Sequence, residues 1–386
     1  MGFEFATAGQ ILFGSGSFER LGGLASRFGC RALIITGRQG RFDPAIRDRL
    51  EAAGVQSSFF SVSGEPTVET VSRGVEAGRG FGADLVASIG GGSVLDAGKA
   101  IAALLTNPGE PLDYLEVIGR GKAWSRPSLP YIAVPTTAGT GTEVTRNAVL
   151  TSPEHGVKAS LRGPWLLPAV ALVDPELTYD LPPDITAASG MDALAQVIEP
   201  MVSAKAQPLT DALCREALPR AARSLRRVFE DGRDKKARED ICFLSLCGGL
   251  ALANAGLGAI HGLAAPLGGM FAAPHGALCA CLLPGVVRAN LSALAGRDPS
   301  STALSRYREI AALLTGSTAA APEAAVQWLL ETRSRLQIPG LARYGMRPEH
   351  IPAVVEKAQA TSSMKGNPVR LSAEELAAVL EEALHP

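Results

Sequence analysis

The chain has 386 residues, of which 46% are apolar, so it is long enough for two domains with cores of ordinary size. Charged residues make up 19% and the formal net charge is −1, which excludes an electrostatic basis for binding nucleic acid or an anionic membrane. The six cysteines lack the spacing of a disulfide scaffold and no secretory signal is visible, so we expect a cytoplasmic protein.

Short β-branched or apolar runs alternate with amphipathic segments in the first half of the chain. Apolar residues recur at helical spacing between these runs, for example in residues 43–53 and 67–81. Such alternation predicts a parallel sheet with crossover helices. The expected strands are residues 32–36, 57–62, 85–89, 131–134 and 169–173.

The strand runs disappear after about residue 182, where Ala, Leu, Arg and Glu dominate long stretches. These stretches predict a second half made entirely of helices, at residues 208–226, 235–255, 300–314, 321–336 and 373–384. We therefore predict an α/β domain at residues 1–180 and an all-α domain at residues 181–386, with Pro182-Pro183 as the hinge. Apolar runs such as residues 32–35 and 244–253 are too short to span a bilayer, so we expect a soluble protein without a membrane partner.

A glycine turn follows the third expected strand. Gly90, Gly91, Gly92 and Ser93 lead into a helical stretch that carries Asp96 in its first turn. Glycines let the backbone approach a phosphate, and the free N–H groups and positive end of the helix then face it. The turn therefore favours phosphate binding, with a plain tight turn as the alternative.

The turn after residue 36 has the sequence Gly37-Arg38-Gln39-Gly40 and lacks the usual GxGxxG dinucleotide fingerprint, so the fold is Rossmann-like with a non-standard glycine motif. A later loop, at residues 135–143, offers four threonine hydroxyls and little bulk. It can line a cofactor groove, with a solvent-facing turn as the alternative. Its threonines are Thr136, Thr137, Thr140 and Thr142.

Two of the five histidines, His261 and His275, are flanked by small residues. Imidazoles from separate elements together with a carboxylate make a reasonable divalent metal site. Asp192 is a candidate carboxylate, because an acid in so apolar a run needs a partner, and Gln196 and Glu199 share its helix face. Buried structural histidines and a helix-capping Asp192 are the alternatives.

Cys279 and Cys281 form the one close cysteine pair. They could ligate a metal, but a two-residue spacing inside the apolar run 277–284 is more typical of small core residues.

Taken together, these segments resemble the iron-containing (group III) alcohol dehydrogenase family, within the dehydroquinate synthase-like/glycerol dehydrogenase superfamily. The likeness runs from about residue 9 to the C-terminal helix. It rests on GGGSxxDxxK at residues 90–99, PTTxGTGxE at 135–143, a long signature over 171–199, and HGxxxPLG with a later PHG at 261–268 and 274–276. Several such blocks in the right order make a specific pattern.

The resemblance implies an α/β domain that holds NADP or NAD, a helical domain that holds a divalent metal, Fe²⁺ or Zn²⁺, and an active site in the cleft between them. It implies a metal-dependent dehydrogenase that transfers hydride between the nicotinamide and a small alcohol or aldehyde. The family's ligands fall on Asp192, Gln196, His261 and His275, of which Asp192, His261 and His275 are our catalytic candidates. Family enzymes often pair as homodimers.

The sequence departs from the family at three informative positions. Members with four protein ligands carry histidine where this chain has Gln196, whereas relatives such as glycerol dehydrogenase hold zinc with three. Ala265 stands where many members place a histidine thought to relay protons. Gly37 stands where some NAD-preferring members place an aspartate, and with Arg38 it favours or at least permits NADP(H). Lys158 aligns with a family lysine near the nicotinamide ribose, and Asp96 with the phosphate-loop helix.

Three alternatives remain beside this function. A maleylacetate-reductase-like enzyme commonly has asparagine in place of Asp192, which counts against it. A cyclase like dehydroquinate synthase brings several further lysines and arginines, in which the aligned region is poor. The third is a nucleotide-binding protein that has lost its metal and its catalysis through Gln196 and Ala265.

Overall fold

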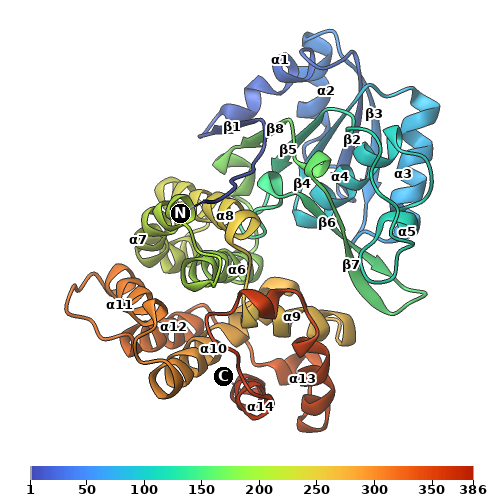
Figure 1. Cartoon of the computed structure of the whole chain (residues 1–386). Helices are drawn as coiled ribbons and strands as arrows, with labels where there is room; N and C mark the ends of the chain where they lie inside the picture. Colours follow the sequence, from blue (N-terminus) through green and yellow to red (C-terminus); the bar gives the residue numbers. More distant parts are fainter. Residues whose placement is uncertain (1, 386) are drawn as a thin grey trace. The chain divides into compact units, whose positions relative to one another are not determined.

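The structure, a computed structural model, describes residues 2–385 and divides into two compact units. The α/β unit comprises residues 6–137 and 141–178. The helical unit comprises the N-terminal segment as far as Phe5, residues 138–140 and the chain from Tyr179 onward. Figure 1 labels the elements of both units. The predicted fold class is confirmed, because a parallel sheet with helices precedes a run of helices only. The predicted domain bounds, residues 1–180 and 181–386, remain a prediction.

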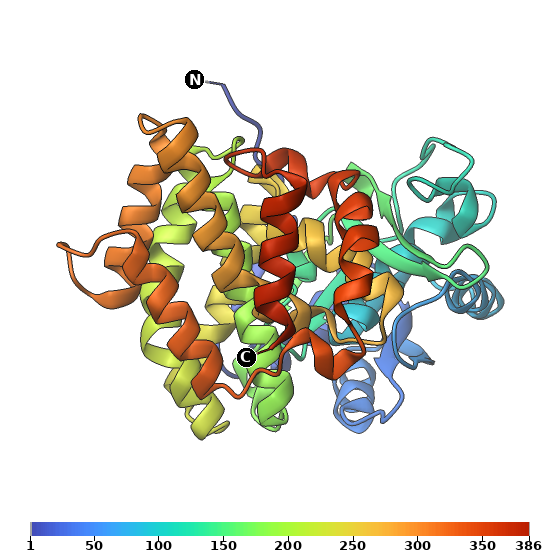
Figure 2. The same ribbon diagram turned by 90° about the horizontal axis from the view of Figure 1, so that it is seen from below.

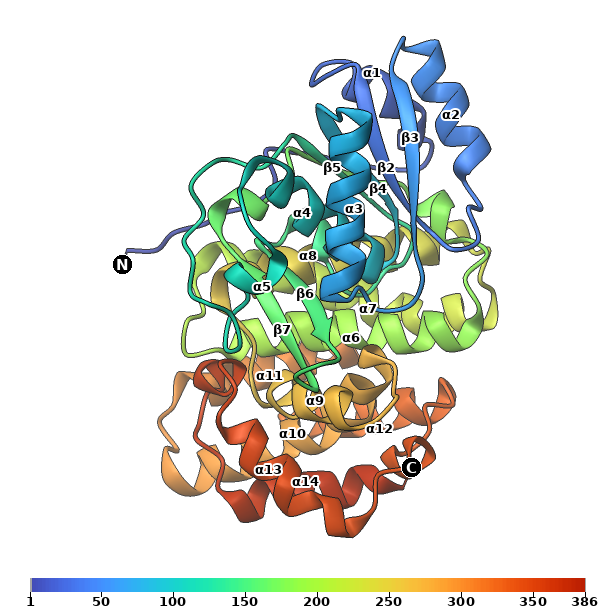
Figure 3. The ribbon, with the colours of Figure 1, turned by 90° about the vertical axis from the view of Figure 1, so that its right-hand side faces the viewer.

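A six-stranded parallel sheet forms the centre of the α/β unit, in the order β1-β8-β5-β4-β2-β3. Its central strands β4 and β5 are buried along their whole length, as expected where helices cover both faces of a parallel sheet. Figure 3 shows the strands side by side with α3 in front of them. The strands are β1 (Gln10–Phe13), β2 (Arg31–Gly37), β3 (Gln56–Val62), β4 (Leu85–Gly90), β5 (Tyr131–Pro135) and β8 (Val170–Val173).

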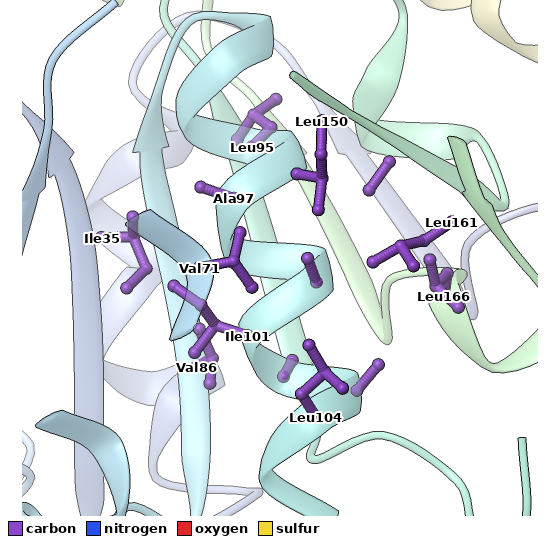
Figure 4. Close-up of a cluster of buried hydrophobic side chains, with 14 of the residues drawn as sticks. Ile35, Val71, Val86, Leu95, Ala97, Ile101, Leu104, Leu150, Leu161 and Leu166 are labelled. Atoms are coloured by element: carbon purple, nitrogen blue, oxygen red, sulfur yellow. The ribbon is translucent and has the colours of Figure 1, made fainter. Parts of the chain in front are cut away.

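Alternate residues of β2, β4 and β5 enter two separate cores, one on each face of the sheet. On β2, Ile34 packs with α1 (Leu21–Ala25) and α2 (Asp43–Ala52), whereas Ile35 packs with α3 (Val68–Phe81) and α4 (Gly92–Thr106). Figure 4 shows the second core, where Val71 of α3 and Ile101 of α4 lie among the sheet residues. These cores hold α4, and with it the glycine turn, against the sheet.

An antiparallel hairpin, β6 (Asn147–Ser152) and β7 (Val157–Arg162), extends the second core beyond the sheet. Leu150 and Leu161 bury their side chains there with Leu104 of α4. The sequence analysis did not predict this hairpin, because its strands alternate in burial and contain no continuous apolar run. The unit's shorter helices are α5 (Pro111–Tyr114), η1 (Ser17–Arg20), η2 (Thr142–Val144), η3 (Pro164–Leu166) and η4 (Pro175–Thr178).

The helical unit is built around α6 (Pro183–Val202), which is buried without interruption over residues 190–202. Proline suits the first position of a helix, where its missing N–H has no partner to lose, so the predicted hinge Pro182-Pro183 coincides with the start of α6. Figure 2 shows the helices of this unit in colours from green to red. They continue with α7 (Pro208–Glu230), α8 (Lys235–Ala255), α9 (Ala259–Met270), α10 (His275–Arg297), α11 (Thr302–Thr315), α12 (Glu323–Arg335), η5 (Leu341–Tyr344), η6 (Pro348–His350), α13 (Ile351–Gln359), η7 (Ser363–Gly366) and α14 (Ala373–Leu384).

The helix α10 is long and apolar enough to cross a membrane by length and composition, a segment that the sequence analysis overlooked. The pair α8 and α9 passes the same test together but is bent by 99°. In α10, 83% of the apolar window is buried inside the structure, as in the core helix of a soluble protein. Packing against α6, α9, α12 and α14 accounts for its apolar composition.

Close packing between α4 and the sheet makes a first prediction. A Cβ added at Gly98 would lie 1.8 Å from Ser88 Oγ on β4, so we expect Gly98→Ala to destabilise the α/β unit by about 2 kcal/mol through overpacking. Gly80, on α3, is the matched control, because a Cβ there meets nothing within 4 Å and alanine favours a helix by about 0.5–1 kcal/mol. Thermal unfolding followed by circular dichroism measures both. Equal midpoints for the two variants would contradict the packing argument.

Candidate functional site

Three helices of the helical unit bring Asp192 of α6, His261 of α9 and His275 of α10 together. His261 Nε2 lies 3.3 Å and His275 Nε2 3.9 Å from Asp192 Oδ1. Asp192 is 1% and His261 6% exposed, whereas the His275 side chain is 43% exposed. The structure therefore brings three of the predicted metal ligands together. Two of them are buried, and the third is partly exposed to solvent.

Glu199 fixes the position of His261. Its Oε1 accepts the Ile260 N–H at 2.7 Å in the first turn of α9, and its Oε2 lies 2.6 Å from His261 Nδ1. A carboxylate only accepts, so Nδ1 carries the hydrogen and Nε2 is left to face Asp192. A Cβ at Gly258, which precedes α9, would lie 3.0 Å from Glu199 Oε1, so glycine lets the helix start come this close.

Gln196, the fourth predicted ligand, lies on α6 one turn after Asp192 and is 3% exposed. A Cβ built at Gly248 of α8 would lie 3.3 Å from its amide oxygen, which places that oxygen beside α8. Asp192 lies in the middle of α6, so the alternative that it caps a helix is wrong.

Asp192 Oδ1, Gln196 Oε1 and His261 Nε2 are all buried without a hydrogen-bond partner. Buried polar atoms in folded proteins are nearly always paired, and an unpaired one costs about 1–3 kcal/mol. A carboxylate oxygen, an amide oxygen and an imidazole nitrogen all offer lone pairs, and a divalent cation accepts all three. The donor set therefore fits a metal ion.

The electrostatics of the centre agree with this fit. Burial by itself lowers the pKa of His261, but Cys279, Glu199 and the nearby Asp192 carboxylate raise it well above its ordinary value. Burial by itself raises the pKa of Asp192, but His275 and His261 hold it below its ordinary value. The surroundings thus favour positive charge at the centre, which a metal cation can supply in place of a proton.

The sequence analysis missed Cys279 as a member of this group. Its thiol, the Asp192 carboxylate and the imidazoles of His261 and His275 each offer a ligand atom, and these atoms all lie within 4.8 Å of one another. The interpretation as a core residue fits Cys281, which donates to the Pro339 carbonyl at 2.8 Å, but is incomplete for Cys279. The spacing of four between His275 and Cys279 puts both on one helix face and could have revealed it.

Ala265 lies on α9, one turn after His261, and its side chain is exposed. A methyl group has no titratable proton, so this position supplies no proton relay.

In the α/β unit the glycine turn joins β4 to α4. Gly91 caps α4 without a side-chain hydrogen bond, and a Cβ there would lie 3.3 Å from Thr137 Cγ2. The Thr136 N–H donates to the Gly90 carbonyl at 2.9 Å, so the turn and the threonine loop lie together after the adjacent strands β4 and β5. Gly92 and Ser93 form the first residues of α4, where free N–H groups and the helix dipole favour an anion.

Asp96 and Thr142, two further predicted cofactor residues, are buried beside Lys99. Asp96 Oδ2 accepts the Val149 N–H of β6 at 3.1 Å, with a further hydrogen bond from the Thr142 side chain. Lys99 Nζ donates to the Thr145 carbonyl and hydroxyl, both at 2.8 Å. Burial raises the pKa of Asp96 to about 6 and lowers that of Lys99 to about 8. Their visible role is to join α4 to the hairpin, and contact with a cofactor stays a prediction for both.

The remaining predicted cofactor residues lie apart from the glycine turn in sequence. Gly37 ends β2, and a Cβ there would meet nothing within 4 Å, while Arg38 is exposed. Lys158 of β7 forms an ion pair with Glu65 at 2.7 Å. Thr140 belongs to the helical unit, where a Cβ at the preceding glycine would lie 2.6 Å from the Ser189 Cβ. Contact of these residues with a cofactor stays a prediction.

Comparisons with known proteins agree along nearly the whole chain. The family model described as iron-containing alcohol dehydrogenase matches residues 8–175, and the model described as Fe-containing alcohol dehydrogenase family, C-terminal, matches residues 186–384. Alcohol dehydrogenase 4 of Saccharomyces cerevisiae (strain YJM789) is 35% identical over 381 residues, which cover 96% of each chain. 1,3-Propanediol dehydrogenase of Klebsiella pneumoniae is 33% identical over 397 residues, covering 99% of this chain and 98% of that protein.

Solved structures show the same relationship. The crystal structure of a 1,3-propanediol oxidoreductase superposes with a TM-score of 0.92 at 31% identity and covers 99% of this chain and 100% of that one. Sulfoacetaldehyde reductase from Bifidobacterium kashiwanohense, in complex with NAD⁺, superposes with a TM-score of 0.87 at 30% identity, covering 100% of this chain and 99% of that one.

The contact between Glu199 and His261 makes a second prediction. Because the carboxylate holds His261 Nε2 toward Asp192, we expect Glu199→Gln to weaken zinc binding about 10–100-fold. Competition with a chromophoric chelator measures the affinity. Glu309→Gln, which removes a charge from a surface pair with Arg215 in the same unit, is the control and should bind zinc as the wild type does. Equal affinities in the two variants would show that Glu199 does not orient a ligand.

Proposed function

This chain belongs to the iron-containing alcohol dehydrogenase family, and on that premise we propose that Asp192, His261 and His275 hold its divalent metal and that the glycine turn holds the phosphates of its nicotinamide cofactor. The protein is an NAD(P)-dependent alcohol dehydrogenase that interconverts alcohols and aldehydes by hydride transfer. The observation that carries the proposed site is the set of buried acceptor atoms on Asp192, His261 and Gln196 that have no partner of their own.

The metal supplies Lewis-acid polarisation of the substrate oxygen, which favours charge on that oxygen during hydride transfer. Glu199 keeps the His261 tautomer and ring orientation constant through the reaction. Asp192 contributes the negative charge of the ligand set, and its burial keeps water from competing for it. The exposed edge of His275 marks the side from which the substrate oxygen enters. Ala265 has no proton to give, so this position neither donates nor accepts the proton of the substrate oxygen.

The cofactor is bound by the backbone of the glycine turn, with Gly90, Gly91, Gly92 and Ser93 facing the phosphates. Thr136 and Thr137 lie against that turn, so their hydroxyls are available to line the cofactor site; Thr140 and Thr142 follow in the same loop, where the Thr142 side chain is bonded to Asp96. Lys158 contacts the ribose of the cofactor, and its ion pair with the exposed Glu65 is broken when the cofactor binds. Gly37 and Arg38 favour or at least permit NADP, because a Cβ at Gly37 would meet nothing within 4 Å, no carboxylate stands there to repel a 2′-phosphate, and a cation follows.

We further propose that the enzyme acts in the cytoplasm as a homodimer, without a nucleic-acid or membrane partner. All six cysteines are free, which suits a reducing compartment. A net charge of −1 provides no electrostatic attraction for a polyanion such as nucleic acid.

Removing the metal tests the proposed centre. We expect the chelated enzyme to lose NADPH-dependent reduction of a panel of small aldehydes, and to recover it with zinc, ferrous or manganese ions, because the substrate oxygen needs a Lewis acid. NADPH binding, followed by its fluorescence, should survive chelation and serves as the control. Full activity in protein shown to be metal-free by elemental analysis would exclude the metal role, and bound NADPH without turnover in metal-loaded protein would favour a non-catalytic nucleotide-binding protein.

The end of β2 makes a prediction about the cofactor. We expect Gly37→Asp to shift the ratio of kcat/KM for NADH to that for NADPH about 100-fold toward NADH, since a carboxylate repels a 2′-phosphate. Gly37→Ser, which adds bulk without charge, should change the ratio far less. Steady-state kinetics with both cofactors measure the ratios. An unchanged ratio in Gly37→Asp would place the 2′-phosphate elsewhere.

A further inference from the structure

We propose that Cys279 is a fourth protein ligand of the metal, so that the centre is an Asp-His-His-Cys site suited to zinc. The inference rests on the proposed metal centre and names a ligand and a metal preference for it. Cys279 is fully buried, and its sulfur belongs to the group of four ligand atoms that all lie within 4.8 Å of one another. Four ligand atoms this close together can bind one cation.

The helix α10 presents Cys279 to the centre by its own geometry. His275 begins α10 and Cys279 follows one turn later, so both side chains project from the same helix face. The Cys279 sulfur lies 3.6 Å from His275 Nε2. A Cβ at Gly276 would lie 2.6 Å from the Ala188 carbonyl oxygen, so glycine lets this end of α10 lie directly against α6, which carries Asp192.

Gln196 is the competing candidate for the fourth position. Its amide oxygen is buried without a hydrogen-bond partner, while the Cys279 sulfur lies within 4.8 Å of the ligand atoms of Asp192, His261 and His275. Thiolate is also the stronger ligand for zinc, because an amide oxygen is hard and uncharged while sulfur is soft and anionic. Ligand chemistry therefore favours Cys279 over Gln196 as the fourth strong ligand of zinc.

Binding through Cys279 is a ligand exchange without a change of oxidation state. The S–H bond breaks, the sulfur lone pair forms the bond to zinc, and the proton passes to solvent through the open side at His275. A thiolate in the set favours zinc over manganese or magnesium, which prefer oxygen ligands.

X-ray absorption at the zinc edge of the full-length, zinc-loaded wild type tests the ligand without any substitution. We expect one sulfur scatterer at about 2.3 Å together with nitrogen and oxygen scatterers at about 2.0–2.1 Å. A shell of nitrogen and oxygen alone would overturn the proposal while leaving the metal role of Asp192, His261 and His275 intact. Failure of the wild type to bind zinc at all would overturn both.

Cobalt substitution tests the residue. We expect an intense near-ultraviolet thiolate-to-cobalt band in the wild type that disappears in Cys279→Ser, with zinc affinity falling about 10-fold or more. Cys281→Ser is the matched control, since Cys281 lies two residues along the same helix and its thiol donates to the Pro339 carbonyl instead. The control should keep the band. A band that persists in Cys279→Ser, or is absent from the wild type, would show that Cys279 is not a ligand.

Discussion

Two buried carboxylates on one face of α6, Asp192 and Glu199, determine the arrangement of the helical unit around the centre. Each is at most 4% exposed, so each needs a partner that compensates for lost hydration. Glu199 has its partners within the protein, because one oxygen accepts the Ile260 N–H and the other contacts His261 Nδ1. That leaves Asp192 to face His261 and His275 with an unpaired oxygen. The start of α9 and the first turn of α10 are thus both fixed by charges on α6.

The α/β unit contains a group of buried charged side chains and, separately, a glycine turn that carries no charged side chain. Asp96, Lys99 and Glu143 are all buried, and burial raises the pKa of Glu143 to about 7 while its neighbour Lys99 opposes that shift. This group joins α4 to the loop and hairpin that follow β5. The glycine turn, by contrast, offers only backbone N–H groups and a helix dipole. The buried network and the two apolar cores hold the turn in place, and a phosphate bound there, as proposed, would need no charged side chain from the turn itself.

The sequence predicted the strands β2, β3, β4, β5 and β8 of the sheet and missed the hairpin, whose burial depends on a partner. The strands β4 and β5 are apolar throughout because both faces are covered, and such runs are visible in sequence. The hairpin β6–β7 has one face on α4 and exposes Val149 on the other, and its packing partner lies about 50 residues earlier in the chain. Asp192, His261 and His275 were predicted from residue chemistry and family likeness. Cys279 was not, because only the meeting of α6, α9 and α10 separates it from an ordinary buried cysteine such as Cys281.

Three of the four grouped side chains are buried, and one is partly exposed to solvent. Cys279 is fully buried, Asp192 and His261 nearly so, and the His275 side chain is 43% exposed. Since His275 and Cys279 are one turn apart on α10, a single helix supplies both the innermost and the outermost atoms of the group. His275 is therefore the exposed member of the group, so an ion held there would be open to a substrate oxygen on that side. On the proposed metal centre, the side chains around His275 are the positions at which we expect substrate selection.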